Sequence, residues 1–188
     1  MARIAKWPLA ISVVSLLLLG GVAARALTRV GIHQGYRPAQ PIAFSHRLHA
    51  GDNKVPCLYC HFAATRSRHA GIPPASVCMN CHALLDTHTA ETAKLTEALA
   101  QRRPIQWIKV HNLPDFVHFD HSQHVSAAVA CAECHGAVET MDRVGQQAPL
   151  TMGWCLDCHR QRAAAAAAAA STSPHGLSNG TDCGKCHH

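Results

Sequence analysis

All ten cysteines of this 188-residue chain occur in five C-x-x-C pairs, and a histidine directly follows each pair. The pairs are Cys57 and Cys60, Cys78 and Cys81, Cys131 and Cys134, Cys155 and Cys158, and Cys183 and Cys186; the histidines are His61, His82, His135, His159 and His187. C-x-x-C-H is the attachment sequence of c-type haem, in which two thiols bond covalently to the porphyrin and the histidine ligates the iron. The chain is therefore predicted to carry five covalently bound c-type haems.

Three other uses of paired cysteines fit this pattern less well. Structural zinc takes C-x-x-C pairs two at a time, and five pairs cannot be divided that way. A disulfide scaffold has varied cysteine spacings and no use for the histidines. A redox dithiol needs one such pair rather than five.

The formal net charge of +6 is explained by the same cofactors. A basic chain suggests a nucleic-acid partner, but the sequence has no run of five or six basic residues and no recognisable nucleic-acid module. Each ferric haem with its two propionates adds a net charge of about −1, which the basic residues balance. We therefore expect no nucleic-acid partner.

Residues 1–30 are predicted to form a membrane anchor. Arg3 and Lys6 precede an uncharged run at residues 7–24, which as a helix is about 27 Å long and close to the roughly 30 Å hydrocarbon core of a bilayer. The alternative is a cleaved signal peptide, since Ala-Arg-Ala at residues 24–26 resembles a cleavage site. Because the sequence retains the segment, we expect an uncleaved single-pass anchor in the cytoplasmic membrane. Covalent haem attachment takes place outside that membrane, so we expect the remainder on the periplasmic side.

An internal duplication organises the rest of the chain. The sequence F-S-H-R-L-H at residues 44–49 precedes the first haem motif, and F-D-H-S-Q-H at residues 119–124 precedes the third. Each F-x-H-x-x-H unit is followed by two motifs, so residues 44–82 and 119–159 are predicted to be two haem-pair modules. With the separate fifth motif at residues 183–187, they form one predicted pentahaem domain over residues 31–188.

The composition predicts a fold built around the cofactors. Aromatic residues make up 5% of the chain, which is too few for a large side-chain core. Proline and glycine are frequent, so we expect a multihaem cytochrome c fold of mostly loops and short α-helices wrapped around a haem cluster. A longer helix is predicted at residues 91–103, ended by Pro104, and eight consecutive alanines at residues 163–170 favour another.

Four histidines are the best candidates for distal iron ligands. A low-spin haem needs a second axial ligand, normally histidine or methionine. His46 with His49, and His121 with His124, are spaced i,i+3 in the two F-x-H-x-x-H units. On a helix this spacing puts both imidazoles on one face, where each can serve a different haem.

The remaining haem needs another ligand, for which the sequence offers two candidates. His111 lies in an apolar stretch at residues 107–114, and Met152 lies three residues before Cys155. We favour Met152, whose thioether stabilises ferrous iron and raises the potential, and we expect that haem to lie towards the electron exit. In the alternative, Met152 only packs on a porphyrin and His111 completes an all-histidine set.

F-x-H-x-x-H units that lead into C-x-x-C-H motifs resemble class III multihaem cytochromes of the cytochrome c3/c7 type. Three longer stretches, at residues 71–82, 107–117 and 150–160, are similar to the pentahaem cytochrome c component of alternative complex III, a quinol-oxidising respiratory and photosynthetic complex. The resemblance covers residues 36–160, and the last motif loosely. It implies a protein that lies beside an iron–sulfur subunit and integral membrane subunits and passes electrons to a monohaem cytochrome or a soluble carrier.

The expected function is electron relay, with no substrate turned over by this chain itself. The alternative from another class is a multihaem reductase of nitrite or a similar small oxyanion. Such an enzyme needs one haem with an open coordination site, and the surplus of histidines argues against it. A membrane-tethered quinol dehydrogenase with a different partner shares the relay chemistry.

Covalent loading is directly measurable. The denatured chain is expected to keep its haem colour on a gel, because thioether bonds to the porphyrin are covalent. The intact mass should exceed the polypeptide mass by five haems. A chain containing zinc and no haem would contradict the prediction.

Overall fold

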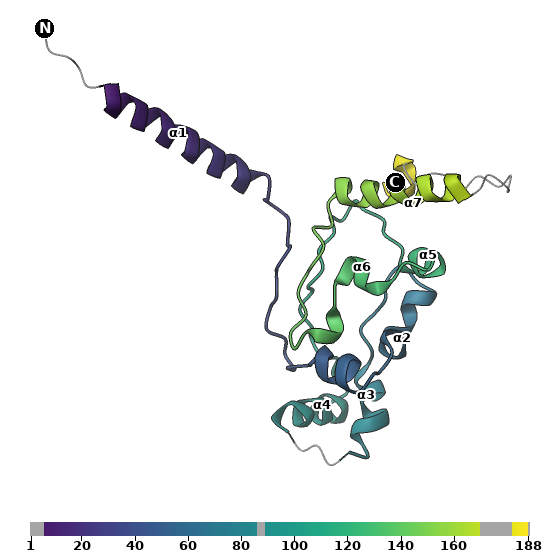
Figure 1. Ribbon diagram of the computed structural model, residues 1–188. Coiled ribbons are helices and arrows are strands. Elements are labelled where there is room, and N and C mark those ends of the chain that lie inside the picture. The colour runs from purple at the N-terminus through teal and green to yellow at the C-terminus, as the bar shows by residue number, and fades with distance from the viewer. Residues whose placement is uncertain (1–5, 86–88, 170–181, 188) are drawn as a thin grey trace, which may run out of the picture. The chain divides into compact units, whose positions relative to one another are not determined.

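Helices and irregular loops make up the computed structural model, which describes residues 6–85, 89–169 and 182–187 and has no strand in that part of the chain (Figure 1). The fold class predicted from the sequence, short helices and loops with one N-terminal apolar helix, is confirmed. The chain divides into two units, Met1–Ile32 and His33–His188.

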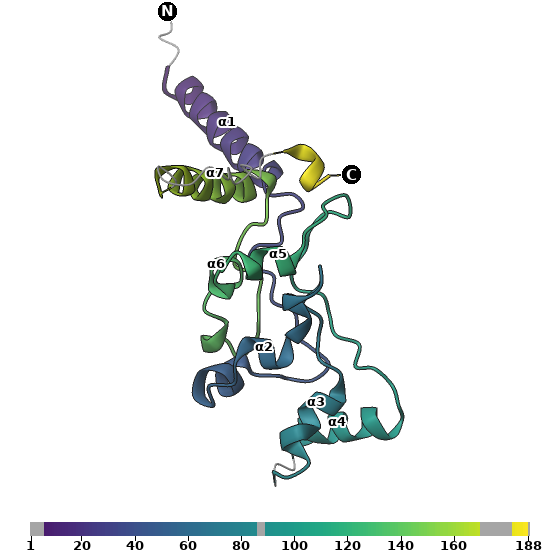
Figure 2. The same ribbon diagram turned by 90° about the vertical axis from the view of Figure 1, so that its right-hand side faces the viewer.

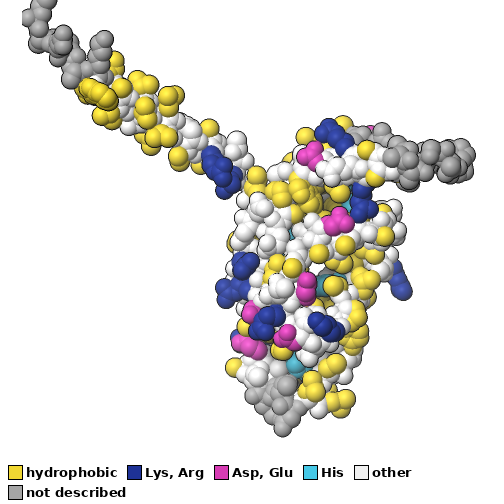
Figure 3. Space-filling model, viewed as in Figure 1, with side chains coloured by type: hydrophobic (Ala, Val, Ile, Leu, Met, Phe, Trp, Pro, Cys, Tyr) yellow, Lys and Arg dark blue, Asp and Glu magenta, His cyan; other side chains and the backbone are white. Residues whose placement is uncertain are grey.

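The N-terminal unit consists of α1 (Lys6–Leu27) and a hydrogen-bonded turn after it. The most apolar 18 consecutive residues within Trp7–Leu27 have a mean hydropathy of 2.0, and none of them is buried. Figure 3 shows hydrophobic side chains along the visible face of this helix. At 1.5 Å per residue it is about 30 Å long, enough to cross a bilayer. Its length and composition are those of a membrane span, and a signal sequence shares both properties.

The second unit contains the other helices and all five C-x-x-C-H motifs. In chain order its described helices are η1 (Arg47–Asp52), α2 (Cys57–Cys60), η2 (Phe62–Thr65), α3 (Ala75–His82), α4 (Ala90–Ala100), α5 (His121–Ser126), α6 (Cys131–His135), η3 (Val138–Thr140), α7 (Met152–Ala169) and η4 (Cys183–Lys185). Within this unit, α3 and α4 lie at one end and α7 at the other, with α2 and α6 between them (Figures 1 and 2).

The helix predicted at residues 91–103 is present as α4, but it ends three residues earlier. Thr89 caps its start in a reciprocal pair of hydrogen bonds with Thr92. At the other end Arg102 adopts a positive φ of 52°, and the N–H groups of Arg102 and Arg103 bond back to the carbonyls of Leu99 and Ala98. This is the Schellman arrangement, which ends the helix before Pro104 does. The predicted alanine helix is present as the end of α7, as far as Ala169.

The two modules pack on each other reciprocally. In the first, η1 contacts η3, which follows the third haem motif: Arg47 N–H bonds to the Met141 carbonyl at 2.9 Å, and its guanidinium pairs with Asp142. In the second, α5 contacts η2, which follows the first haem motif. The histidine-bearing helix of each module is therefore supported by residues of the other.

Gly51 is the tightest point of the η1–η3 contact, because a Cβ atom there would collide with the carbonyl oxygen of Glu139. Gly51→Ala is expected to lower the free energy of unfolding of the haem-loaded protein by about 1–3 kcal/mol, since the backbone must move apart. Gly153→Ala in α7 is the control, because no heavy atom lies within 4 Å of its Cβ position. Thermal unfolding followed by circular dichroism compares the variants, and equal melting temperatures would contradict the prediction.

Candidate haem-binding site

Four C-x-x-C pairs lie within about one turn of helix, in α2, α3, α6 and α7, and the fifth begins in η4 and ends at Cys186, directly after that helix. Residues three apart on a helix are neighbours on its surface, so the two thiols of a pair project from one side. All ten cysteines are free thiols in this structure. The pairs therefore present the arrangement that attachment to two positions of one porphyrin requires.

Backbone carbonyls fix five of the predicted ligand histidines through their Nδ1 atoms. The Nδ1–oxygen distances are 2.8 Å for His49 to Ser45, 2.7 Å for His61 to Gly71, 2.7 Å for His121 to Arg68, 2.7 Å for His124 to Asp120 and 3.2 Å for His187 to Phe116. A carbonyl can only accept, so Nδ1 carries the proton and donates it. The Nε2 lone pair of each ring is then available for iron.

Three of the predicted distal histidines face a motif histidine at nearly the same separation. The ring centroids are 6.1 Å apart for His49 and His82, 6.4 Å for His121 and His135, and 6.0 Å for His124 and His159. Two imidazoles on opposite sides of one metal ion have centroids roughly 6 Å apart, since a metal–nitrogen bond is about 2 Å and the ring centre lies about 1 Å further on. These three pairs match the spacing of two axial ligands on one iron.

His46 is the fourth predicted distal histidine and lies near His61. Burial lowers its pKa to about 4, and the neighbouring rings of His61 and His49 contribute to the same lowering. At neutral pH the ring is therefore uncharged, the form in which histidine ligates a metal. Its Nδ1 is buried and has no hydrogen-bond partner among the described residues, so it differs from the carbonyl-bonded His121 of the second module.

A phenylalanine orders each pair of distal histidines in the same way. Phe44 meets His46 edge-on at 4.8 Å and stacks on His49 at 4.3 Å. Phe119 meets His121 edge-on at 4.8 Å and lies against His124 at 4.5 Å. The sequence duplication is thus accompanied by matching ring contacts.

Cysteines of different motifs lie near one another in a continuous series. Four cysteines have a pKa that is raised mainly by burial and next by the charge of a cysteine from another motif. These neighbours are Cys78 for Cys60, Cys131 for Cys57, Cys158 for Cys134, and Cys186 for Cys155. The motifs are therefore neighbours in the order second, first, third, fourth, fifth. This order runs from α3 through α2 and α6 to α7 (Figure 2).

The second unit has few buried apolar side chains with which to form a core. Among the described residues only Ala64, Leu95 and Ala148 are buried and apolar, whereas Phe62 and Phe116 are more than half exposed. Protein interiors are close-packed, so such a chain needs another apolar body to fold around. Porphyrins attached at the cysteines meet this need, and the residues present fit haem both as ligands and as surroundings.

The two candidates for the remaining ligand lie in different settings. His111 contacts the motif histidine His135, with its Nε2 3.1 Å from Nδ1 of that ring and the two rings nearly perpendicular. Met152 is the first residue of α7, which also carries the fourth motif, and it is 68% exposed. Ligation of an iron by either side chain stays a prediction.

Residues 116–118 contact the fifth motif, and the sequence did not predict these contacts. The carbonyl of Phe116 accepts from His187, the two rings stack with centroids 5.7 Å apart, and His118 N–H bonds to the Cys186 carbonyl at 2.8 Å. Residues 116–118 thus hold a motif that stands alone in the sequence. No spacing in the sequence signals this contact, which depends on the path of the chain after α4.

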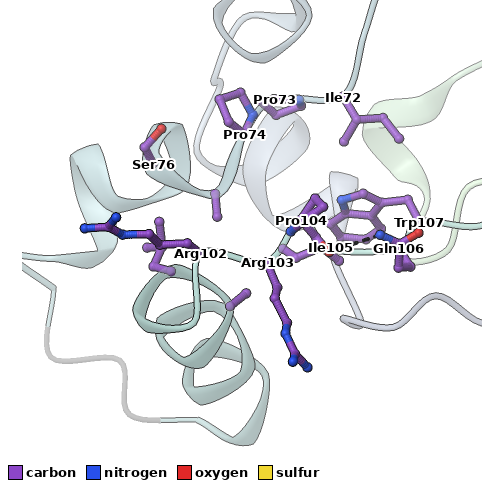
Figure 4. Close-up of a pocket in the computed structure, with 13 residues that line it drawn as sticks. Ile72, Pro73, Pro74, Ser76, Arg102, Arg103, Pro104, Ile105, Gln106 and Trp107 are labelled. Carbon is purple, nitrogen blue, oxygen red and sulfur yellow. Dashed lines mark hydrogen bonds between the residues drawn. The ribbon is translucent and has the colours of Figure 1, made fainter.

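A pocket of about 730 Å³ adjoins the helix of the second motif. Residues 72–76, which lead into α3 and form its first two positions, line the pocket together with the end of α4 and residues 102–107. In Figure 4 the prolines and isoleucines supply apolar walls, and the side chains of Arg102 and Arg103 point in different directions. The pocket lies at one end of the series of motifs.

Met152→Leu tests the predicted thioether ligand. If Met152 ligates an iron, the variant leaves one haem five-coordinate and shifts one component of the redox titration, since leucine has no donor atom. Electron paramagnetic resonance and potentiometry of the oxidised protein measure both effects. Unchanged potentials without a high-spin signal would contradict the ligation, and Met141→Leu is the matched control.

Comparisons with known proteins agree with this site. A family profile described as cytochrome c3 matches residues 123–188. A curated relative, the multihaem cytochrome c subunit of a menaquinone reductase from Nitratidesulfovibrio vulgaris (strain Hildenborough), is 31% identical over 97 residues, which is 51% of this chain and 45% of the relative. The match thus spans less than half of that relative.

The fold, the motifs and these matches define a class: residues 123–188 match the cytochrome c3 profile, and the described fold is that of a multihaem cytochrome c3-like domain.

Proposed function

We propose that this chain is a membrane-anchored pentahaem c-type cytochrome that relays electrons from quinol oxidation to a downstream cytochrome or other carrier. We further propose that it belongs to a quinol-oxidising respiratory complex similar to alternative complex III. The observation that carries the proposal is the continuous series of neighbouring motifs, combined with facing histidine pairs at about 6 Å. A series of adjacent redox centres is suited to moving electrons across the domain.

The residues of the chain bind and orient the cofactors. Haem iron, when bound, supplies one-electron oxidation and reduction. The cysteines would hold the porphyrins covalently, and the paired histidines would ligate the iron. Carbonyl groups such as those of Gly71 and Arg68 hold the imidazole rings in one orientation, so the ligands need not rearrange when the charge of the iron changes.

This arrangement favours a relay over a reductase of nitrite or a similar oxyanion. A substrate-binding haem needs one open axial position. At four motifs a predicted distal histidine lies opposite or near the motif histidine, whereas the fifth motif has no such facing pair of rings among the described residues. These contacts support a relay in which four irons would each have two histidine ligands.

We propose that α1 anchors the chain in the cytoplasmic membrane and that the haem domain lies on the periplasmic side. The partners are then an iron–sulfur subunit and integral membrane subunits of the complex, with a monohaem cytochrome or soluble carrier as acceptor. A second candidate function is suggested by the relative, which is described as part of a menaquinone reductase: the same series of haems would then deliver electrons to the quinone.

The experiment is anaerobic mixing of the purified complex, with all co-purifying subunits, with menaquinol. The haems are expected to be reduced, as measured by visible absorbance. Carbon monoxide is expected to leave the reduced spectrum unchanged, because four irons would have two histidine ligands and the remaining one the predicted Met152, which leaves no free position. His49→Ala, which lacks one predicted axial imidazole, is the control expected to bind carbon monoxide.

A carbon monoxide band in the wild-type protein would favour the reductase instead. Haems that menaquinol does not reduce, but that menaquinone oxidises, would favour the second candidate. The co-purifying subunits identify the complex.

A further inference from the structure

His111 lies in a segment whose backbone is fixed on both sides of it. The Gln40 side chain accepts from Ile108 N–H at 2.9 Å and donates to the Ile108 carbonyl at 3.0 Å. The fully buried Gln146 accepts from Asn112 N–H at 2.9 Å and donates to the Ala148 carbonyl at 3.1 Å. The position of the His111 ring is thus set by the fold rather than by its own side chain alone.

The direction of the hydrogen bond between His111 and His135 follows from the chemistry of the motif. A histidine that ligates iron through Nε2 keeps its proton on Nδ1. His135 Nδ1 must therefore donate, and His111 Nε2, 3.1 Å away, accepts. His111 approaches the nitrogen of His135 that is not used for iron, so it does not compete with His121 for the opposite axial position.

The His111 acceptor distinguishes the third motif from the first, which has the equivalent position in the other module. The first motif histidine, His61, donates to the carbonyl of Gly71 at 2.7 Å. Every other predicted ligand whose Nδ1 partner the structure gives also bonds to a carbonyl. An imidazole nitrogen is a stronger base than a peptide carbonyl and draws the Nδ1 proton further from the ring, which makes the proximal imidazole a more electron-rich ligand.

We propose that His111 is a positioning residue that lowers the reduction potential of the third haem relative to the first by accepting the Nδ1 proton of His135. The inference rests on the proposed function, because it requires haem at Cys131 and Cys134. A more electron-rich axial ligand stabilises ferric iron. The two modules therefore hold haems of unequal potential although their ligand sets are alike.

His111→Phe in the full-length, haem-loaded protein is the test. Phenylalanine keeps an aromatic ring against His135 but accepts no proton, so one of the potentials is expected to rise. A tenfold change in the ratio of reduced to oxidised haem corresponds to about 59 mV for one electron, and we expect a shift on this order. His69→Phe, an exposed histidine outside the ligand set, should leave all potentials unchanged. His111→Gln, whose side-chain oxygen accepts, should restore part of the wild-type value.

Each result decides the question. A raised potential in His111→Phe, with every haem still low-spin by electron paramagnetic resonance, supports the role. A new high-spin signal would show instead that His111 is an iron ligand, and unchanged potentials would show that the contact is only structural; both overturn the proposal. If His111→Phe loads fewer haems than the wild type, the potentials of His111→Gln are measured instead. The amide oxygen of glutamine is a weaker acceptor than imidazole, so the proposal requires one potential to rise in this variant as well. A wild-type chain without haem would reject the proposed function itself.

Discussion

An iron with two imidazole ligands requires two rings, from different parts of the chain, with centroids about 6 Å apart and their Nε2 atoms facing. The rest of the second unit serves this geometry. Carbonyls orient the rings, Phe44 and Phe119 hold them in pairs, and short helices bring the motif histidines opposite. Ligation of one iron by two such histidines would link distant residues and would restrict the chain much as a covalent cross-link does. Few other apolar contacts are available among the described residues to stabilise this unit.

The sequence predicted those features that depend on local residue type. The motifs, the apolar helix and the duplicated F-x-H-x-x-H units are all visible in the sequence. His49 and His124 lie 6.1 and 6.0 Å from motif histidines, and their role as iron ligands stays a prediction. What the sequence did not reveal depends on the path of the chain. The contact of His111 with His135 and the support of His187 by Phe116 are made by loops, which carry no periodic pattern.

The way in which α4 ends is another feature that the sequence did not reveal, and it depends on a single residue. Proline at position 104 predicts the end of the helix to within a turn, but the termination is made by Arg102 in the left-handed region, where glycine is the usual residue. No sequence signal marks arginine for that conformation. The bend then directs the chain into residues 105–112, the segment that contains His111. The left-handed conformation of a non-glycine residue therefore contributes to the contact between His111 and His135.

The reciprocal support between η1 and η3, and between α5 and η2, has a consequence for how the protein is made. Neither module can complete its fold until the other has been synthesised, because each histidine-bearing helix rests on residues that follow a motif of its counterpart. Contacts of such sequence separation form slowly. The early motifs must therefore stay in an open chain until the later ones have been made, and this leaves their thiols accessible for covalent attachment.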